Sequence, residues 1–150
     1  MQEIKTKLYK ACEELLDERL KTIQSSISDV NNALLSETKS SAGDKHETGR
    51  AMLQLEREKL GKQLYEVEKQ KHTLQRINLD TYLKNINFGS VVETTQANYF
   101  IAISIGKLCI DKKEFYAISS ETPMAKHLTS KTTGDTISFG NITFSIINTY

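Results

Sequence analysis

The chain has 150 residues, a formal net charge of only +1 and 38% hydrophobic residues, a composition typical of a globular protein. A balance so close to neutral disfavours free nucleic-acid binding, which normally shows as a basic excess. No apolar run approaches the roughly 20 residues that span a bilayer, so we expect no membrane partner and a cytoplasmic location.

The first half of the chain predicts a long helix over residues 2–36. Apolar side chains recur there at alternating four- and three-residue steps, the spacing of a coiled-coil seam. The sequence has one proline, Pro123, so no proline interrupts this region. The seam positions are Leu16, Leu20, Ile23, Ile27, Val30 and Leu34.

The same spacing resumes after a polar bend at residues 40–50 and predicts a second helix. Three of its seam positions are polar. Gly61 lowers helix stability by about 1 kcal/mol relative to alanine, and nothing in the sequence explains its presence. Two long helices joined by a short turn predict an antiparallel hairpin, here residues 1–82 with its tip at 43–49. The seam positions are Leu53, Arg57, Leu60, Leu64, Val67, Lys71, Leu74 and Asn78.

Residues 83–150 are rich in β-branched and aromatic side chains and predict a small sheet domain. We expect strands at 90–94, 98–104, 108–110, 114–119, 136–139 and 142–147. Thr122 as N-cap and Pro123 at the first helical position predict a short helix over 124–128. The whole is an α+β fold, with an antiparallel sheet. Five aromatic side chains alternate along these strands, and we expect most of them to lie in the core: Phe100, Phe115, Tyr116, Phe139 and Phe144.

The two cysteines, Cys12 and Cys109, lack the spacing of a metal site or of a redox CxxC motif. We therefore expect two reduced thiols that behave as small hydrophobic side chains.

Four stretches of the chain resemble the Gre family of bacterial transcript cleavage factors. At the bend, residues 43–48 are similar to the family's Gly-Asp-Leu-Ser-Glu-Asn. Residues 87–92 resemble its Phe-Gly-Ser/Ala-x-Val junction, and residues 118–126 its Ile-Ser/Asn-x-x-Ser-Pro-Ile-Ala/Gly-Lys/Arg segment. Residues 131–135 match its Lys-x-x-Gly-Asp turn. The resemblance implies an N-terminal antiparallel coiled coil followed by an FKBP-like domain.

The resemblance also implies a function as an elongation factor that is not itself an enzyme. The coiled-coil tip would enter the secondary channel of RNA polymerase and contact the 3′ end of the nascent RNA only indirectly. There Asp44 and Glu47 would supply carboxylates to a catalytic Mg²⁺ shared with the polymerase, since two-metal RNA hydrolysis needs a second ion. Lys45 and Arg50 would contact RNA phosphates or polymerase acids, unless they are ordinary surface charges.

A segment of the second domain is implied to dock on a coiled coil of the largest polymerase subunit. This segment consists of Glu121, Thr122, Pro123 and Met124. Alternatively, this segment is only the start of a helix, with one methionine in the core.

Other interpretations of the tip stay open. Asp44 and Glu47 have the spacing of a capping box, in which Asp44 is an N-cap and Glu47 reaches back to its backbone N–H. Lys45 and His46 replace an apolar residue and a serine of the family pattern, which allows a paralogue that occupies the channel and inhibits. A non-catalytic coiled-coil adaptor is a second class of function. A prolyl isomerase rests on fold analogy alone and lacks an aromatic-lined pocket.

Overall fold

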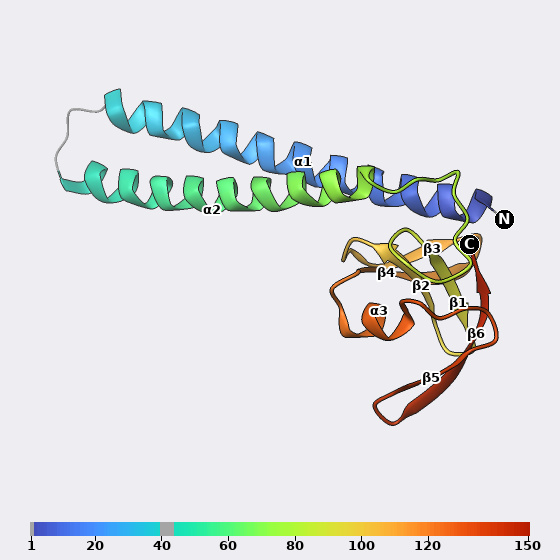
Figure 1. Cartoon of the computed structure of the whole chain (residues 1–150). Helices are drawn as coiled ribbons and strands as arrows, with labels where there is room; N and C mark the ends of the chain where they lie inside the picture. The colour runs from blue at the N-terminus through green and yellow to red at the C-terminus, as the bar shows by residue number, and fades with distance from the viewer. Residues whose placement is uncertain (1, 40–43) are drawn as a thin grey trace. The chain divides into compact units, whose positions relative to one another are not determined.

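The computed structural model of the chain describes residues 2–39 and 44–150, without the side chains of residues 2, 38, 39 and 44–46 (Figure 1). Two long helices come first, and six strands with one short helix follow them. This order confirms the predicted α+β fold class.

The first helix, α1 (Gln2–Lys39), has 38 residues, and the second, α2 (Asp44–Gln75), has 32. Both are uninterrupted, as the absence of proline predicts. The seam prediction fails at its last position, because Asn78 lies beyond the end of α2. Its side-chain Oδ1 accepts a hydrogen bond of 2.9 Å from the backbone N–H of Asp80, and this local turn competes with further helix.

Part of the predicted seam is buried. Leu16, Leu60 and Val67 are buried, and the polar seam position Lys71 has a partner, since its Nζ lies 2.7 Å from Asp17 Oδ1. An ion pair between an early residue of α1 and a late residue of α2 requires antiparallel helices. The predicted hairpin is therefore confirmed.

The six strands form one sheet with the order β3-β4-β2-β1-β6-β5. Every predicted strand exists, with ends shifted by at most two residues. The strands are β1 (Val91–Thr94), β2 (Asn98–Ala102), β3 (Gly106–Ile110), β4 (Lys113–Ser119), β5 (Thr136–Phe139) and β6 (Ile142–Thr149).

The sheet is not wholly antiparallel, because β2 and β4 run parallel, with Phe100 opposite Ala117. The short link between β2 and β3 crosses the end of β4: Ser104 Oγ accepts from Ser119 N at 3.0 Å, and Ile105 N donates to Ala117 O at 3.2 Å. In the β3–β4 hairpin, β4 is therefore the strand that pairs with β2, and β3 lies at the edge of the sheet. Strand propensity does not encode this choice of neighbour.

The helix α3 (Pro123–Leu128) packs on one face of the sheet through Ala125 and Leu128. Of the predicted aromatic core, Phe100, Phe115 and Phe144 are buried, and Phe139 is half-buried against the core cluster. Tyr116 is the exception to this prediction. It is exposed, and its ring centroid lies 6.1 Å from that of the half-buried Tyr99, which packs against the core cluster. The core cluster comprises Ile86, Val92, Ile101, Ala125, Leu128, Ile137, Phe144 and Ile146.

The chain divides into two compact units, one of residues Glu14–Lys71 and one of Met1–Glu13 with His72–Tyr150. In the second unit the first turns of α1 are tied to the sheet domain, since Lys7 Nζ lies 2.9 Å from Asp111 Oδ2. Gly89 of the junction motif has a φ of 91°, and a Cβ there would lie 3.3 Å from Ile77 Cγ2. Glycine therefore suits this position for its backbone and for space.

Candidate functional site

The candidate cleavage residues lie where α1 passes into α2. Because α2 begins at Asp44, both Asp44 and Glu47 belong to its first turn. The side chain of Glu47 is exposed. The side chains of Asp44 and Lys45 fall outside the described part of the chain, so the metal-ligand and capping-box interpretations of this pair both stay predictions.

A third carboxylate that the sequence did not point to lies near this end of the hairpin. A Cβ built on Gly49 would lie 3.6 Å from Glu37 Oε1, so the Glu37 side chain of α1 covers Gly49 of α2. The antiparallel pairing of α1 and α2 brings these two residues together, and no local sequence motif indicates their contact. Arg50 follows Gly49 and is exposed, and it interacts within the chain, as Glu37 does. Among the residues that the structure describes, no three His, Cys, Asp or Glu side chains are grouped to hold a metal ion.

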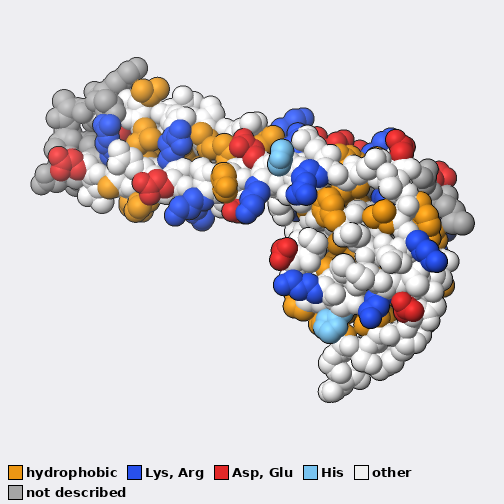
Figure 2. Space-filling view, in the orientation of Figure 1, with side chains coloured by type: hydrophobic (Ala, Val, Ile, Leu, Met, Phe, Trp, Pro, Cys, Tyr) orange, Lys and Arg blue, Asp and Glu red, His pale blue; other side chains and the backbone are white. Residues whose placement is uncertain are grey.

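The outer part of the hairpin has little apolar packing of its own. In the described ranges 24–37 and 47–59, no side chain is fully buried. Three large apolar side chains are instead well exposed: Leu35 at 59%, Met52 at 67% and Leu55 at 65%. A contiguous apolar patch is typical of a surface that meets another macromolecule, whereas apolar side chains exposed singly are common. Lys, Arg, Asp and Glu side chains are interspersed along the hairpin surface in Figure 2.

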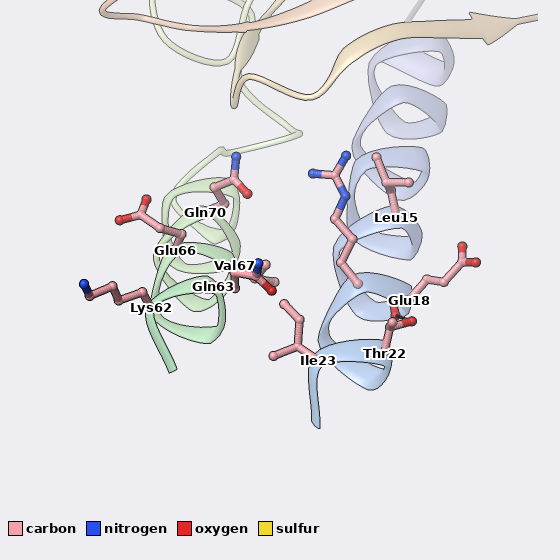
Figure 3. A pocket seen from close by; sticks show the side chains of 10 residues that line it. Leu15, Glu18, Thr22, Ile23, Lys62, Gln63, Glu66, Val67 and Gln70 are labelled. Atoms are coloured by element: carbon pink, nitrogen blue, oxygen red, sulfur yellow. Dashed lines mark hydrogen bonds between the residues drawn. The ribbon is translucent and has the colours of Figure 1, made fainter. Parts of the chain in front are cut away.

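A groove of about 630 Å³ runs between the helices farther along the hairpin. Its apolar lining comes from Leu15 and Ile23 of α1 and Val67 of α2. Figure 3 shows Ile23 and Val67 pointing into the space between the helices, whereas Lys62 and Glu66 point away from it. The groove therefore offers an apolar floor with charged side chains at its edge, and the sequence did not predict it.

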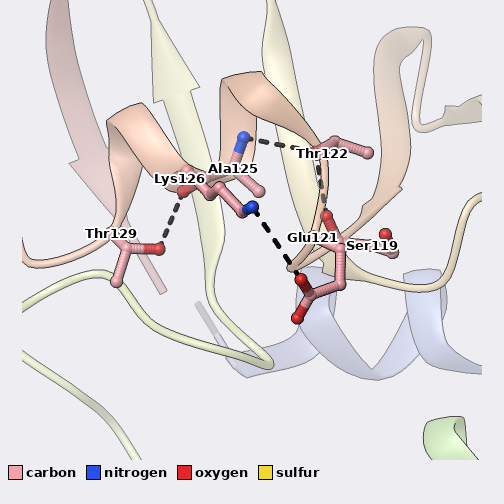
Figure 4. Close-up of polar contacts among 6 residues, drawn as sticks. All are labelled: Ser119, Glu121, Thr122, Ala125, Lys126 and Thr129. Carbon is pink, nitrogen blue, oxygen red and sulfur yellow. Dashed lines mark hydrogen bonds and ion pairs between the residues drawn. The ribbon is translucent and has the colours of Figure 1, made fainter.

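The second candidate site is the segment before α3 (Figure 4). Thr122 is its N-cap: Oγ1 accepts a hydrogen bond of 3.3 Å from Ala125 N and donates one of 2.9 Å to Ser119 O. Pro123 occupies the first helical turn, as predicted. The hydroxyl of Thr129 closes the other end by donating to Ala125 O at 2.7 Å. This short helix is therefore fixed by side-chain hydrogen bonds at both ends.

Of the four predicted docking residues before α3, two are exposed and two stabilise the fold. Glu121 and Pro123 are exposed, and the Glu121 carboxylate lies 3.9 Å from Lys126 Nζ in a surface ion pair of little energetic weight. Thr122 serves as the cap, and Met124 packs against the core cluster. The helix start with a core methionine is confirmed, and docking on a partner stays a prediction.

Comparisons with known proteins leave the family of this chain open. No family model matches the chain, and no curated protein matches it. A solved structure of the transcription factor Gfh1 aligns over 91% of this chain and 92% of its own, with 18% sequence identity and a TM-score of 0.35. In the described part of the chain, no helix combines the length and apolar character that crossing a membrane requires.

Proposed function

We propose that this protein is a Gre-type accessory factor of RNA polymerase. Its hairpin end enters the secondary channel, and Asp44 and Glu47 supply carboxylates for Mg²⁺-dependent cleavage of backtracked RNA. The observation that carries the proposal is the start of α2 at Asp44, because it puts both acids in the first turn at the reversal of the hairpin. The four family-like stretches of sequence, in the family's order, support the same function.

The chemistry requires little of this chain beyond ligand donation. Mg²⁺, when bound there, stabilises the attacking water or the leaving oxygen in an in-line hydrolysis. Glu47 offers an exposed carboxylate, the hard oxygen ligand that Mg²⁺ prefers. Side chains three residues apart on a helix lie on one side, so the carboxylates of Asp44 and Glu47 suit a shared ion. The polymerase holds the active site, and this protein stimulates the cleavage that the polymerase carries out.

Two surfaces would support the docking. The exposed Leu35, Met52 and Leu55 would contact the channel wall, because they have no apolar cover in the described chain. Glu121 and Pro123, held by the capped start of α3, would contact the largest subunit.

The direct test is RNA cleavage by purified, backtracked polymerase complexes in the presence of the protein. We expect the Asp44→Ala/Glu47→Ala variant to lose stimulation by at least about tenfold, as loss of metal-supporting carboxylates does elsewhere, without losing polymerase binding. The matched control is Glu56→Ala/Glu58→Ala, which removes two exposed acids farther along α2. Full stimulation by the double tip variant would contradict the proposal.

The same assay separates cleavage from inhibition. If the wild type slows the polymerase and the double tip variant slows it equally, the hairpin blocks the channel and donates no ligand.

A second candidate, a coiled-coil adaptor, is favoured by the groove lined by Leu15, Ile23 and Val67. An adaptor that binds there would tolerate both tip substitutions. Its binding would be lost in Arg19→Glu or Lys62→Glu variants, which change the groove edge and leave the apolar seam intact.

A further inference from the structure

A buried lysine lies in the unit that contains the sheet. Lys5 of α1 is only 4% exposed, although lysine is rarely buried without a charged partner. Its Nζ donates a hydrogen bond of 3.1 Å to the backbone oxygen of Thr81. An ammonium has three donors. Among the ion pairs of the described residues none includes Lys5, so its charge has no counterion there.

Lys5 and Thr81 both line a cavity of about 420 Å³. This volume falls within the roughly 300–1,000 Å³ of small-molecule sites. Tyr82 also lines the cavity and is exposed, so solvent can reach the interior. The hydroxyl of Tyr82 lies 3.4 Å from Thr149 Oγ1, at the long limit of a hydrogen bond, which leaves both groups able to bond a ligand.

The remaining lining side chains are neutral and polar. They include the Asn148 carboxamide and the Tyr150 phenol, and no carboxylate is among them. Burial, and after it a hydrogen bond with the Glu93 carboxylate, raises the pKa of the Tyr150 hydroxyl. The cavity lining therefore combines one buried lysine with hydroxyl and amide groups, and the buried Glu93 carboxylate lies behind Tyr150. A buried unpaired charge is costly, and a bound anion would offset that cost.

We propose that this cavity binds a small organic monocarboxylate. Its carboxylate accepts hydrogen bonds from Lys5 Nζ, and its body lies against Tyr82 and Thr149. A single cation matches a single negative charge, and the surrounding hydroxyls supply hydrogen bonds that orient the ligand. This site is independent of the hairpin end and of any action on RNA polymerase.

The experiment is a titration of the full-length, isotope-labelled protein with sodium benzoate, followed by the backbone amide signals in NMR. Benzamide serves as the uncharged ligand of the same shape. We expect saturable shifts at Thr81, Tyr82 and Asn148 with benzoate at millimolar concentration and much smaller ones with benzamide. Lys5→Met should weaken benzoate binding by roughly tenfold or more, because it removes a charge-assisted hydrogen bond. Lys10→Met changes an exposed lysine of the same helix and should bind as the wild type does.

Several outcomes would overturn the assignment. These are the absence of saturable shifts in the wild type, equal shifts with benzoate and benzamide, or unchanged benzoate binding by a folded Lys5→Met variant. Should Lys5→Met not fold, Tyr82→Phe replaces it, since this exposed residue tolerates the loss of its hydroxyl. That variant should bind benzoate a few-fold more weakly, and unchanged binding would contradict the role of Tyr82. Saturable binding of inorganic phosphate in place of benzoate would also contradict a carboxylate site.

Discussion

The two cysteines of the chain differ in environment and therefore in reactivity. Cys12 of α1 is fully buried, and its burial raises the pKa of the thiol to about 12. Cys109 of β3 is exposed. Since the thiolate is the reactive form, a thiol at neutral pH with such a raised pKa is almost unreactive.

We expect iodoacetamide at neutral pH to modify Cys109 of the native protein and to leave Cys12 unmodified until the protein unfolds. Mass spectrometry of the intact protein and of its peptides measures both sites. The Cys109→Ser variant should take up no label while folded. Rapid labelling of Cys12 in native conditions would show that the base of α1 opens readily.

At the level of elements, two glycines predict opposite effects of the same substitution. A Cβ on Gly61 of α2 would meet no atom within 4 Å, so the helix penalty of glycine is not compensated by a close contact. Gly61→Ala should raise the free energy of unfolding by about 0.5–1 kcal/mol. Urea denaturation followed by circular dichroism gives this value.

Gly89→Ala is the opposing case. The φ of 91° and the 3.3 Å approach to Ile77 Cγ2 both work against a side chain, so this variant should lose stability by more than about 1 kcal/mol. A neutral Gly89→Ala change would mean that the junction between α2 and β1 relaxes without cost.

At the scale of the whole molecule, stability should be unevenly distributed. The described residues between Ile23 and Leu60 include no buried side chain, whereas β1 is buried along its whole length. Few buried contacts mean a small free energy of local opening. In native-state hydrogen exchange, we expect amides of residues 24–37 and 47–59 to exchange faster than those of β1, β2 and β6. Equal protection of both regions would show that the outer hairpin has stabilising contacts beyond those described.

The sequence predicted those features that local chemistry decides. The seam periodicity and the lack of proline before Pro123 specify the hairpin, and Thr122 with Pro123 specifies the start of α3. Pairing between distant segments was not accessible in this way. The parallel β2–β4 pair depends on which strand of the β3–β4 hairpin lies next to β2. For Tyr116, the two-residue period predicts the face of the sheet but not that no other element covers this position.

The candidate sites also differ in whether nearby residues or distant segments of the chain form them. Asp44 and Glu47 could be proposed as ligands from the motif at residues 43–48 together with its place between two helices and the family-like stretches farther along the chain, and that role stays a prediction. Glu37 beside Gly49 and the buried Lys5 could not, because each depends on a neighbour far along the chain, and lysine on a helix is ordinarily exposed.

The ion pair between Lys71 and Asp17 has a consequence for the alignment of the two helices. Repeating heptads permit a sliding alternative, in which α2 shifts by seven residues, or about 10 Å, along α1. That shift would separate the Lys71 ammonium from Asp17 and move Gly49 by the same 10 Å relative to Glu37. Lys71 is a polar residue at a seam position, and such a residue is a recognised way to select one alignment. The alignment that decides where the hairpin ends is therefore favoured by a contact more than twenty residues away from that end.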